Sequence, residues 1–266
     1  MNPIDNVVSS GNVNDIVAVL SFLALAMLVV TAARLGTIAL FVLSATFILL
    51  SNVTVGMSVQ VFGVIFPWAI LVYSLVYLVT YLICEFHGQK MAYKLAVSNV
   101  AVQVILWGYV WTSMLVSPIP DGIVVRDAME SLFATTKQIS VAALLASIGP
   151  ILGVYIFGRI RRKWEQMAVR HNEDVGIAGA LLRNNTLAVV VRNKLAAFAG
   201  QIINTIVFFT IADFNTRTAT SVVLGAIASF SAVKMVVSMA DVPFLIVACR
   251  QLTIRKSLTS TRSTIT

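Results

Sequence analysis

Seven long apolar segments run through almost the whole chain and constrain its fold more than any other feature. They lie at about 15–33, 35–56, 62–84, 93–116, 138–158, 195–213 and 219–249. A helix needs about 20 apolar residues to cross a bilayer, and each segment approaches or exceeds that length. Charged residues make up 11% of the chain, whereas soluble domains average about 25%. The sequence predicts an all-α, multi-pass bundle of about seven helices in the cell membrane, with residues 1–266 as one integral domain.

The positions of the basic residues predict an orientation. Of the 19 lysines and arginines, fifteen fall in connections on the side of the C-terminus, and one, Lys234, lies inside the last segment. The opposite side holds only three, which are Arg126, Lys137 and Arg217. Basic residues accumulate in cytoplasmic loops, so we expect the N-terminus outside and the C-terminus inside. The net charge of +8 then reflects topology and does not indicate a nucleic-acid partner.

Motifs of soluble enzymes are missing from the sequence. It has no phosphate-binding loop, no dinucleotide fingerprint, no His-Glu-x-x-His and no Gly-x-Ser-x-Gly. The two histidines, His87 and His171, fall in predicted loops, and the two cysteines, Cys84 and Cys249, have no metal-ligand spacing. We therefore expect no catalytic residue, no metal site and no cofactor.

Two amides interrupt the sixth apolar segment. Gln201 and Asn204 are three residues apart, which places both side chains on one face of a helix. An amide that faces lipid is costly, so this face should meet protein, water or a ligand. Substrate contact and hydrogen bonding to neighbouring helices both remain open.

The last apolar segment carries two charges, Lys234 and Asp241, about two helical turns apart. Charges at membrane depth usually face a bundle interior or a wet cavity. We expect Lys234 to line a central cavity, with Asp241 nearer its cytoplasmic mouth. The alternative is that Lys234 extends to the membrane surface while Asp241 sits at the interface. The pairing of Lys234, with Asp241 through a bridging group or with Glu85 directly, is left open.

A tyrosine stripe runs along the third segment. Tyr73, Tyr77 and Tyr81 recur every four residues, and Glu85 continues the stripe by one turn. Such a stripe suits helix packing, and it equally suits a flat heterocycle that stacks on rings and donates to a carboxylate. In the fifth segment, Gly149 and Gly153 form a G-x-x-x-G around Pro150. This pattern favours close helix packing with a kink, and an unwound binding segment is the alternative.

Several of these short motifs, in this order, resemble the queuosine precursor transporter family, also described as a vitamin-uptake-type family. The resemblance covers about 45–250. It rests on Ser51–Asn52, Phe66–Pro67, Glu85–Gly88, Arg192–Asn193, Gln201–Thr205, Lys234 and Asp241–Phe244. The chain departs from the family at three positions, where Tyr81, Gly153 and Asn204 stand in place of aspartates.

The resemblance implies a six-helix core preceded by an extra first span, with a central site for deazaguanine-type bases. The residues expected to bind substrate are Asn52, Tyr77, Tyr81, Glu85, Gln201, Asn204, Lys234 and Asp241. The amides can each donate and accept, as the edge of a purine-like base requires.

Three classes of function are compatible with these features. The first is a secondary transporter for uptake of a purine-like or vitamin-like molecule. The second is a substrate-binding membrane subunit of a multi-component vitamin-uptake system, energised by separate ATPase partners. The third is a non-transport protein, either a scaffold or an intramembrane enzyme. The expected partners are a small-molecule substrate and the lipid bilayer, with no nucleic acid, and a homodimer is left open.

Overall fold

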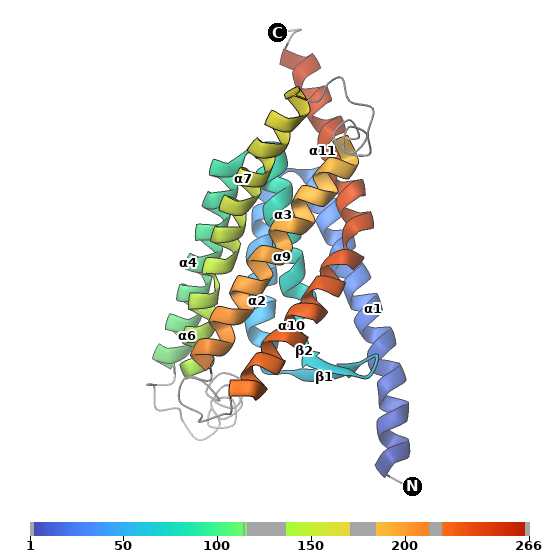
Figure 1. Cartoon of the computed structure of the whole chain (residues 1–266), viewed down its shortest axis with the longest axis vertical. Coiled ribbons are helices and arrows are strands. Elements are labelled where there is room, and N and C mark those ends of the chain that lie inside the picture. Colours follow the sequence, from blue (N-terminus) through green and yellow to red (C-terminus); the bar gives the residue numbers. More distant parts are fainter. Residues whose placement is uncertain (1–2, 114, 116–136, 171–184, 213–219, 264–266) are drawn as a thin grey trace.

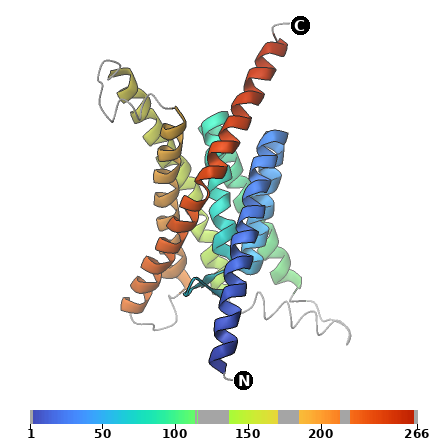
Figure 2. The ribbon, with the colours of Figure 1, turned by 90° about the vertical axis from the view of Figure 1, so that its right-hand side faces the viewer.

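The helix α3 (Ala69–His87) lies at the centre of the bundle, with fifteen of its nineteen residues buried. The computed structural model describes residues 3–113, 115, 137–170, 185–212 and 220–263. Figure 2 shows α1 (Pro3–Leu35) and α2 (Thr37–Thr54) on one side of α3, and α9 (Asn185–Ala212) and α10 (Thr220–Ala240) on the other. Figure 1 shows α4 (Gln89–Ser113), α6 (Lys137–Ala146) and α7 (Ile148–Arg170) along a further flank.

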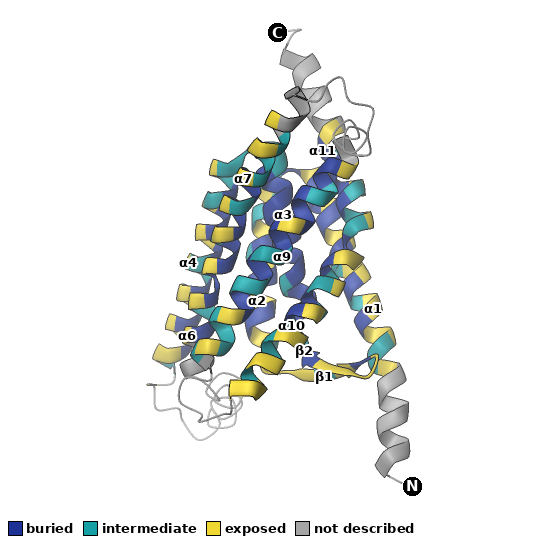
Figure 3. Ribbon diagram, viewed as in Figure 1, coloured by how far each residue is buried: buried dark blue, intermediate teal, exposed yellow. Residues whose placement is uncertain are grey.

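Seven helices in the described part of the chain are long and apolar enough to span a membrane, which confirms the predicted all-α membrane bundle. Their outer faces carry exposed apolar side chains, among them Ile38, Ile105 and Val236. Buried residues concentrate on α3 and on the helix faces directed toward it (Figure 3). Apolar side chains on the outside of such a bundle can face lipid without cost, so the protein is a multi-pass integral membrane protein.

The predicted third segment began too early. Residues 58–67 form a hairpin of β1 (Ser58–Val61) and β2 (Val64–Pro67), with Val59 opposite Phe66. The turn has positive φ at Phe62 (49°) and Gly63 (78°), the geometry of a tight two-residue hairpin turn. The backbone N–H of Phe62 donates to Asp15 Oδ1 at 2.6 Å, which ties the turn to α1. We call this end of the bundle the hairpin end, and the opposite end the C-terminal end (Figure 1).

The predicted last segment, 219–249, is not one helix. α10 ends at Ala240, and α11 (Val242–Ser263) begins after a turn at Asp241. Pro243 has no N–H to continue the helical hydrogen bonds across this point. α11 then packs against α1, whereas α10 packs against α9. The break therefore places Asp241 inside the bundle, where it is 1% exposed.

The predicted sixth segment began too late. α9 starts at Asn185, so Arg192 and Lys194 lie within the helix and are buried. Both had been assigned to a cytoplasmic connection, and their removal reduces the fifteen basic residues counted on that side to thirteen. Arg126, Arg217 and His171 lie outside the described residues.

Candidate functional site

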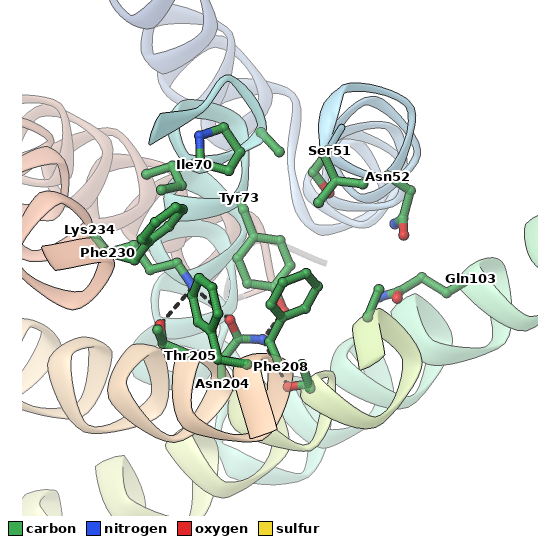
Figure 4. Close-up of a pocket in the computed structure, with 16 residues that line it drawn as sticks. Ser51, Asn52, Ile70, Tyr73, Gln103, Asn204, Thr205, Phe208, Phe230 and Lys234 are labelled. Carbon is green, nitrogen blue, oxygen red and sulfur yellow. Dashed lines mark hydrogen bonds between the residues drawn. The ribbon is translucent and has the colours of Figure 1, made fainter. Parts of the chain in front are cut away.

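A cavity of about 90 Å³ opens in the half of the bundle nearer the hairpin end (Figure 4). That volume is several times the roughly 10–15 Å³ that one water needs, so the cavity has room for a small molecule. Helices α2, α3, α4, α6, α9 and α10 all contribute side chains. The lining residues are Ser51, Asn52, Val55, Pro67, Ala69, Ile70, Tyr73, Gln103, Ala143, Ala146, Asn204, Thr205, Phe208, Phe209, Phe230 and Lys234. We call these residues the pocket.

Lys234 is the one charged residue among those that line the pocket. Its Nζ donates to Asn204 Oδ1 at 2.8 Å and to Thr205 Oγ1 at 2.9 Å. The same nitrogen lies 5.8 Å from the ring centroid of Tyr73, within the range of a cation–π contact. Figure 4 shows the ammonium group directed toward Asn204 and Thr205. The lysine therefore turns inward from α10 and does not extend to the membrane surface.

Asn204 connects the pocket to a break between α6 and α7. Its Nδ2 donates to the Ala146 carbonyl at 2.9 Å and to Tyr73 Oη at 3.1 Å. In an uninterrupted helix the Ala146 carbonyl would accept from the residue four positions on, but that residue is Pro150, which has no N–H. The amide supplies the missing donor. Asn204 thus forms a hydrogen bond between helices and also lies on the pocket wall. Bonding to neighbouring helices, one of the two roles left open, is present, and its place in the pocket leaves substrate contact open.

Two further amides on the pocket wall are held by bonds between helices. Asn52 Oδ1 accepts from Trp107 Nε1 at 3.2 Å, and Gln103 Nε2 donates to Ser147 Oγ at 2.8 Å. Phe209 and Phe230 meet edge to face, with ring centroids 4.9 Å apart. The pocket therefore combines fixed amides with aromatic rings and one ammonium group.

The tyrosine stripe forms a ladder of hydrogen bonds between α3 and α9. Tyr77 Oη donates to the Gly200 carbonyl at 3.1 Å, and Tyr81 Oη donates to the Ala196 carbonyl at 3.0 Å. The bond between Tyr73 and Asn204 precedes these two. The bond from Arg192 Nη2 to Glu85 Oε1, at 2.8 Å, follows them. Each step of four residues forward on α3 matches four residues backward on α9. We call these four bonds the α3–α9 ladder.

Three glycines give the ladder its space. A Cβ at Gly153 would collide with the Tyr81 hydroxyl, and one at Gly200 would lie 2.9 Å from Tyr77 Cε1. A Cβ at Gly149 would lie 2.8 Å from the Gly200 carbonyl oxygen. The G-x-x-x-G therefore allows α7 to pack closely against α9 and α3. The helix is interrupted beside it at Ser147, so close packing with a kink, the interpretation that the pattern favoured, describes this segment.

Two buried ion pairs lie at the C-terminal end. Arg192 pairs with Glu85 at 2.8 Å, with side chains 7% and 12% exposed, and Lys194 pairs with Asp241, with side chains 6% and 1% exposed. Lys194 Nζ also donates to Ser238 Oγ at 3.4 Å. Neither carboxylate pairs directly with Lys234, so the predicted direct pair with Glu85 is wrong, and a bridged pair with Asp241 stays a prediction. The two basic residues of α9 take the place of that lysine.

The residues predicted to bind substrate separate into two groups. Asn52, Asn204 and Lys234 line the pocket. The other predicted residues lie between the pocket and the C-terminal end, and they are Tyr77, Tyr81, Glu85, Gln201 and Asp241.

Gln201 differs from the rest of the second group, because it is 1% exposed and neither polar atom of its amide has a hydrogen-bond partner.

Several residues of the pocket and its surroundings were not predicted from the sequence. Tyr73 belongs to the tyrosine stripe, and it lines the pocket. Its position in the stripe, one helical turn before Tyr77, is the pattern that could have identified it. Gln103 is an amide in an apolar segment, with Asn99 four residues before it, the same signal that singled out Gln201 and Asn204. Arg192 and Lys194 had no such signal, because two charges beside an apolar run are typical of a helix end.

Residues 67–248 match the model of a protein family described as "Putative vitamin uptake transporter". The matched range contains α3 through α10 and the start of α11, including the ladder, both ion pairs and most of the pocket. No curated protein and no solved structure matches the chain significantly. Among the described residues, no group of three or more His, Cys, Asp or Glu side chains could hold a metal ion.

Proposed function

The chain belongs to the vitamin uptake transporter family, and on that basis we propose that it takes up a planar, hydrogen-bonding heterocycle of the deazaguanine type. The pocket is the proposed binding site. Its composition carries the proposal, because three fixed amides, a ring of aromatic side chains and one ammonium group face the same cavity. Ligand sites are typically apolar cavities with a few placed polar groups.

The aromatic residues of the pocket suit the faces of a flat ring. Tyr73, Phe208, Phe209 and Phe230 come from α3, α9 and α10. Aromatic rings attract one another when stacked with an offset or met edge to face. A bicyclic base between these side chains would present its polar edge to the remaining lining residues.

The polar residues of the pocket suit the edge of such a ring. Asn52 and Gln103 supply donors and acceptors. Asn204 supplies an acceptor, since both of its N–H donors go to Ala146 and Tyr73, and Lys234 supplies a donor only. An ammonium group has three donors, of which two go to Asn204 and Thr205. The third is left for a substrate acceptor, such as a ring carbonyl.

We further propose that the hairpin end faces the outside of the cell. After Arg192 and Lys194 are set aside, the sequence assigns thirteen basic residues to the connections on the side of the C-terminus, against three on the opposite side. The positive-inside rule then gives an outside N-terminus. In this orientation the pocket lies nearer the outer surface, which is where a substrate for uptake arrives.

The test is uptake of labelled deazaguanines by cells that lack their own salvage transporter. Cells that express the chain should accumulate label, and the Lys234→Met variant should not, because it keeps the bulk of the side chain and removes its donors. Lys94→Met is the matched control, because Lys94 is exposed on α4. Uptake by the Lys234→Met variant at the normal rate would refute the role of the pocket. Uptake that requires co-expressed ATPase subunits would favour the multi-component system.

A further inference from the structure

No carboxylate among the described residues forms an ion pair with Lys234. Among the charged side chains that the described residues bury, Arg192 and Lys194 each pair with a carboxylate. The hydrogen-bond partners of Lys234 are a neutral amide oxygen and a hydroxyl. The lysine is 9% exposed and lines the pocket.

A buried ammonium group without a counter-ion is costly, because neutral dipoles replace only part of its hydration. Proteins normally bury such charges in pairs, as this chain does twice at the C-terminal end. The pocket is a place beside Lys234 where a group from outside the protein can enter. An anionic substrate would therefore gain more at this site than an uncharged molecule of the same shape.

We infer that the substrate carries an anionic group, such as a carboxylate, on its planar ring system, and that this group pairs with Lys234. The inference rests on the proposed function, since it takes the pocket as the binding site. Asn204 and Thr205 fix two of the three donors of the ammonium group, which directs the remaining one. The aromatic side chains would then contact the ring. A cationic substituent on the same ring would be repelled.

The experiment measures binding of matched ligands to the purified full chain by isothermal titration calorimetry. Three 7-deazaguanines that differ only at C7 carry a carboxylate, a carboxamide or an aminomethyl group. A hydrogen bond to a charged group contributes enough to strengthen binding by about 10-fold to 150-fold. We expect the carboxylate to bind more tightly than the carboxamide by a factor in that range, and the aminomethyl compound to bind most weakly.

Two variants show whether Lys234 causes the preference. Lys234→Met should abolish the difference between carboxylate and carboxamide, whereas Lys94→Met should preserve it. Asn204→Asp places a carboxylate beside the ammonium group of Lys234 and compensates its charge. The ratio of carboxylate to carboxamide affinity should therefore decrease in this variant. A preference that survives in the Lys234→Met variant would overturn the inference.

A second ligand pair separates this inference from the proposed function. Nicotinate and nicotinamide differ by the same carboxylate and carboxamide on a smaller planar ring. Equal binding of the two members of each pair would overturn the inference, while binding of the deazaguanines would still support the proposed function. If no deazaguanine binds but nicotinate binds more tightly than nicotinamide, the proposed ring is wrong and the inferred charge is right. Failure of both pairs to bind would overturn both.

A different observation concerns the C-terminal end, which is closed but incompletely bonded. Glu85 Oε2, Arg192 Nε and the whole amide of Gln201 are buried without hydrogen-bond partners. A partly satisfied polar network is weaker than a fully satisfied one. The four ladder bonds, which include the Arg192–Glu85 pair, and the Lys194–Asp241 pair nevertheless join the helices between the pocket and this end.

We propose that the pairs Arg192–Glu85 and Lys194–Asp241 form the inner closure of the transport route and separate when substrate passes. Gln201 lies on α9 between the pocket and Lys194, seven residues from the latter and therefore on a similar face. Separation of the pairs would give its amide a partner, either water or the moving substrate. This proposal also rests on the proposed function.

The native thiols report on this closure. Cys84 precedes Glu85, Cys249 lies within electrostatic reach of Glu85, and both are buried. Asp241→Asn should raise the rate of maleimide labelling of these thiols by about tenfold or more, because it leaves the Lys194 charge buried without its carboxylate. The reversed pair, Lys194→Asp with Asp241→Lys, should restore slow labelling.

Controls separate local opening from unfolding. Arg159→Gln removes an exposed charge at the same end and should leave labelling unchanged. The melting temperature and the affinity of the Asp241→Asn variant for pocket ligands show whether the bundle remains folded. Fast labelling in a variant that retains its melting temperature and ligand affinity supports the closure. Labelling at the normal rate in Asp241→Asn would refute it, and so would fast labelling that appears only together with a lower melting temperature. Neither result would affect the pocket.

Discussion

Gly149→Ala adds one methyl group where α7, α9 and α3 meet. The new Cβ would lie 2.7 Å from Asn204 Cβ, 2.8 Å from the Gly200 carbonyl oxygen and 3.0 Å from Tyr77 Oη. Non-bonded carbon atoms are most stable at about 3.5–4.0 Å. The first two contacts are a Cβ and a backbone oxygen, which no change of rotamer can move. The helices must therefore separate by several tenths of an ångström or more.

The magnitude follows from three contributions. Overpacking of a filled core costs about 1–3 kcal/mol. Weakening of the bond from Tyr77 to Gly200 costs up to about 0.5–1.5 kcal/mol more. Alanine gains about 1 kcal/mol over glycine in a helix interior. We expect a net loss of about 1–3 kcal/mol in the free energy of unfolding, in which the clash outweighs the gain in helix propensity.

The assay is thermal unfolding in detergent, followed by the fluorescence of the purified protein. Gly108→Ala is the matched control, because a Cβ at Gly108, within α4, would meet nothing within 4 Å. Gly149→Ala should lower the melting temperature by several degrees, and Gly108→Ala should maintain or raise it. Adding Tyr77→Phe to Gly149→Ala should not rescue stability, since the backbone contact remains. If Gly149→Ala is as stable as Gly108→Ala, the close approach of α7 and α9 is refuted.

Three further predictions concern the ladder, the orientation and the break before α11. Tyr81→Phe removes the bond to the Ala196 carbonyl and should reduce the free energy of unfolding by about 0.5–1.5 kcal/mol. Tyr109→Phe, at a side chain 69% exposed, should not reduce it. Equal melting temperatures of these two variants would contradict the ladder. Cysteines introduced at Ser9 and Ser260 should be labelled by an impermeant reagent in intact cells at Ser9 only, and the opposite pattern would invert the proposed orientation. Pro243→Ala restores a donor for the helix across Asp241 and should slow uptake by straightening the break, so normal uptake would show that the break has no role in transport.

Hydropathy is sufficient to predict the bundle but not the ends of its helices. The hairpin was missed because residues 62–68 are as apolar as the helix that follows, and a turn at Phe62–Gly63 leaves no mark on mean hydropathy. α9 was shortened because charged residues usually end a membrane span. Arg192 and Lys194 are tolerated inside it because their partners, Glu85 and Asp241, are 107 and 47 residues away in the sequence. No local pattern contains that information.

The candidate site was predicted where one helix face was sufficient and missed where several helices meet. Asn204 and Lys234 were identified because a polar group in an apolar segment must face the interior. Their contact with each other depends on how α9 packs against α10, which the sequence pattern does not determine. The bond from Asn204 to the Ala146 carbonyl depends in turn on Pro150, a residue on another helix. The local signals were correct, but the pairings required the fold.

The four bonds, or rungs, of the α3–α9 ladder differ in whether the partner on α9 is a backbone carbonyl or a side chain. Tyr77 and Tyr81 donate to backbone carbonyls, and a helix presents an equivalent carbonyl one turn further on, about 5.4 Å along its axis. A displacement of α9 by one turn would therefore offer each of these hydroxyls a new acceptor of the same kind. Tyr73 and Glu85, at the two ends, bind the side chains of Asn204 and Arg192, and a side chain has no such duplicate. The hydrogen bonds of the two inner rungs do not by themselves select an alignment, whereas those of the two outer rungs do. Substitutions at the outer positions should therefore act on the alignment of α9, whereas substitutions at the inner positions should act on the strength of its attachment.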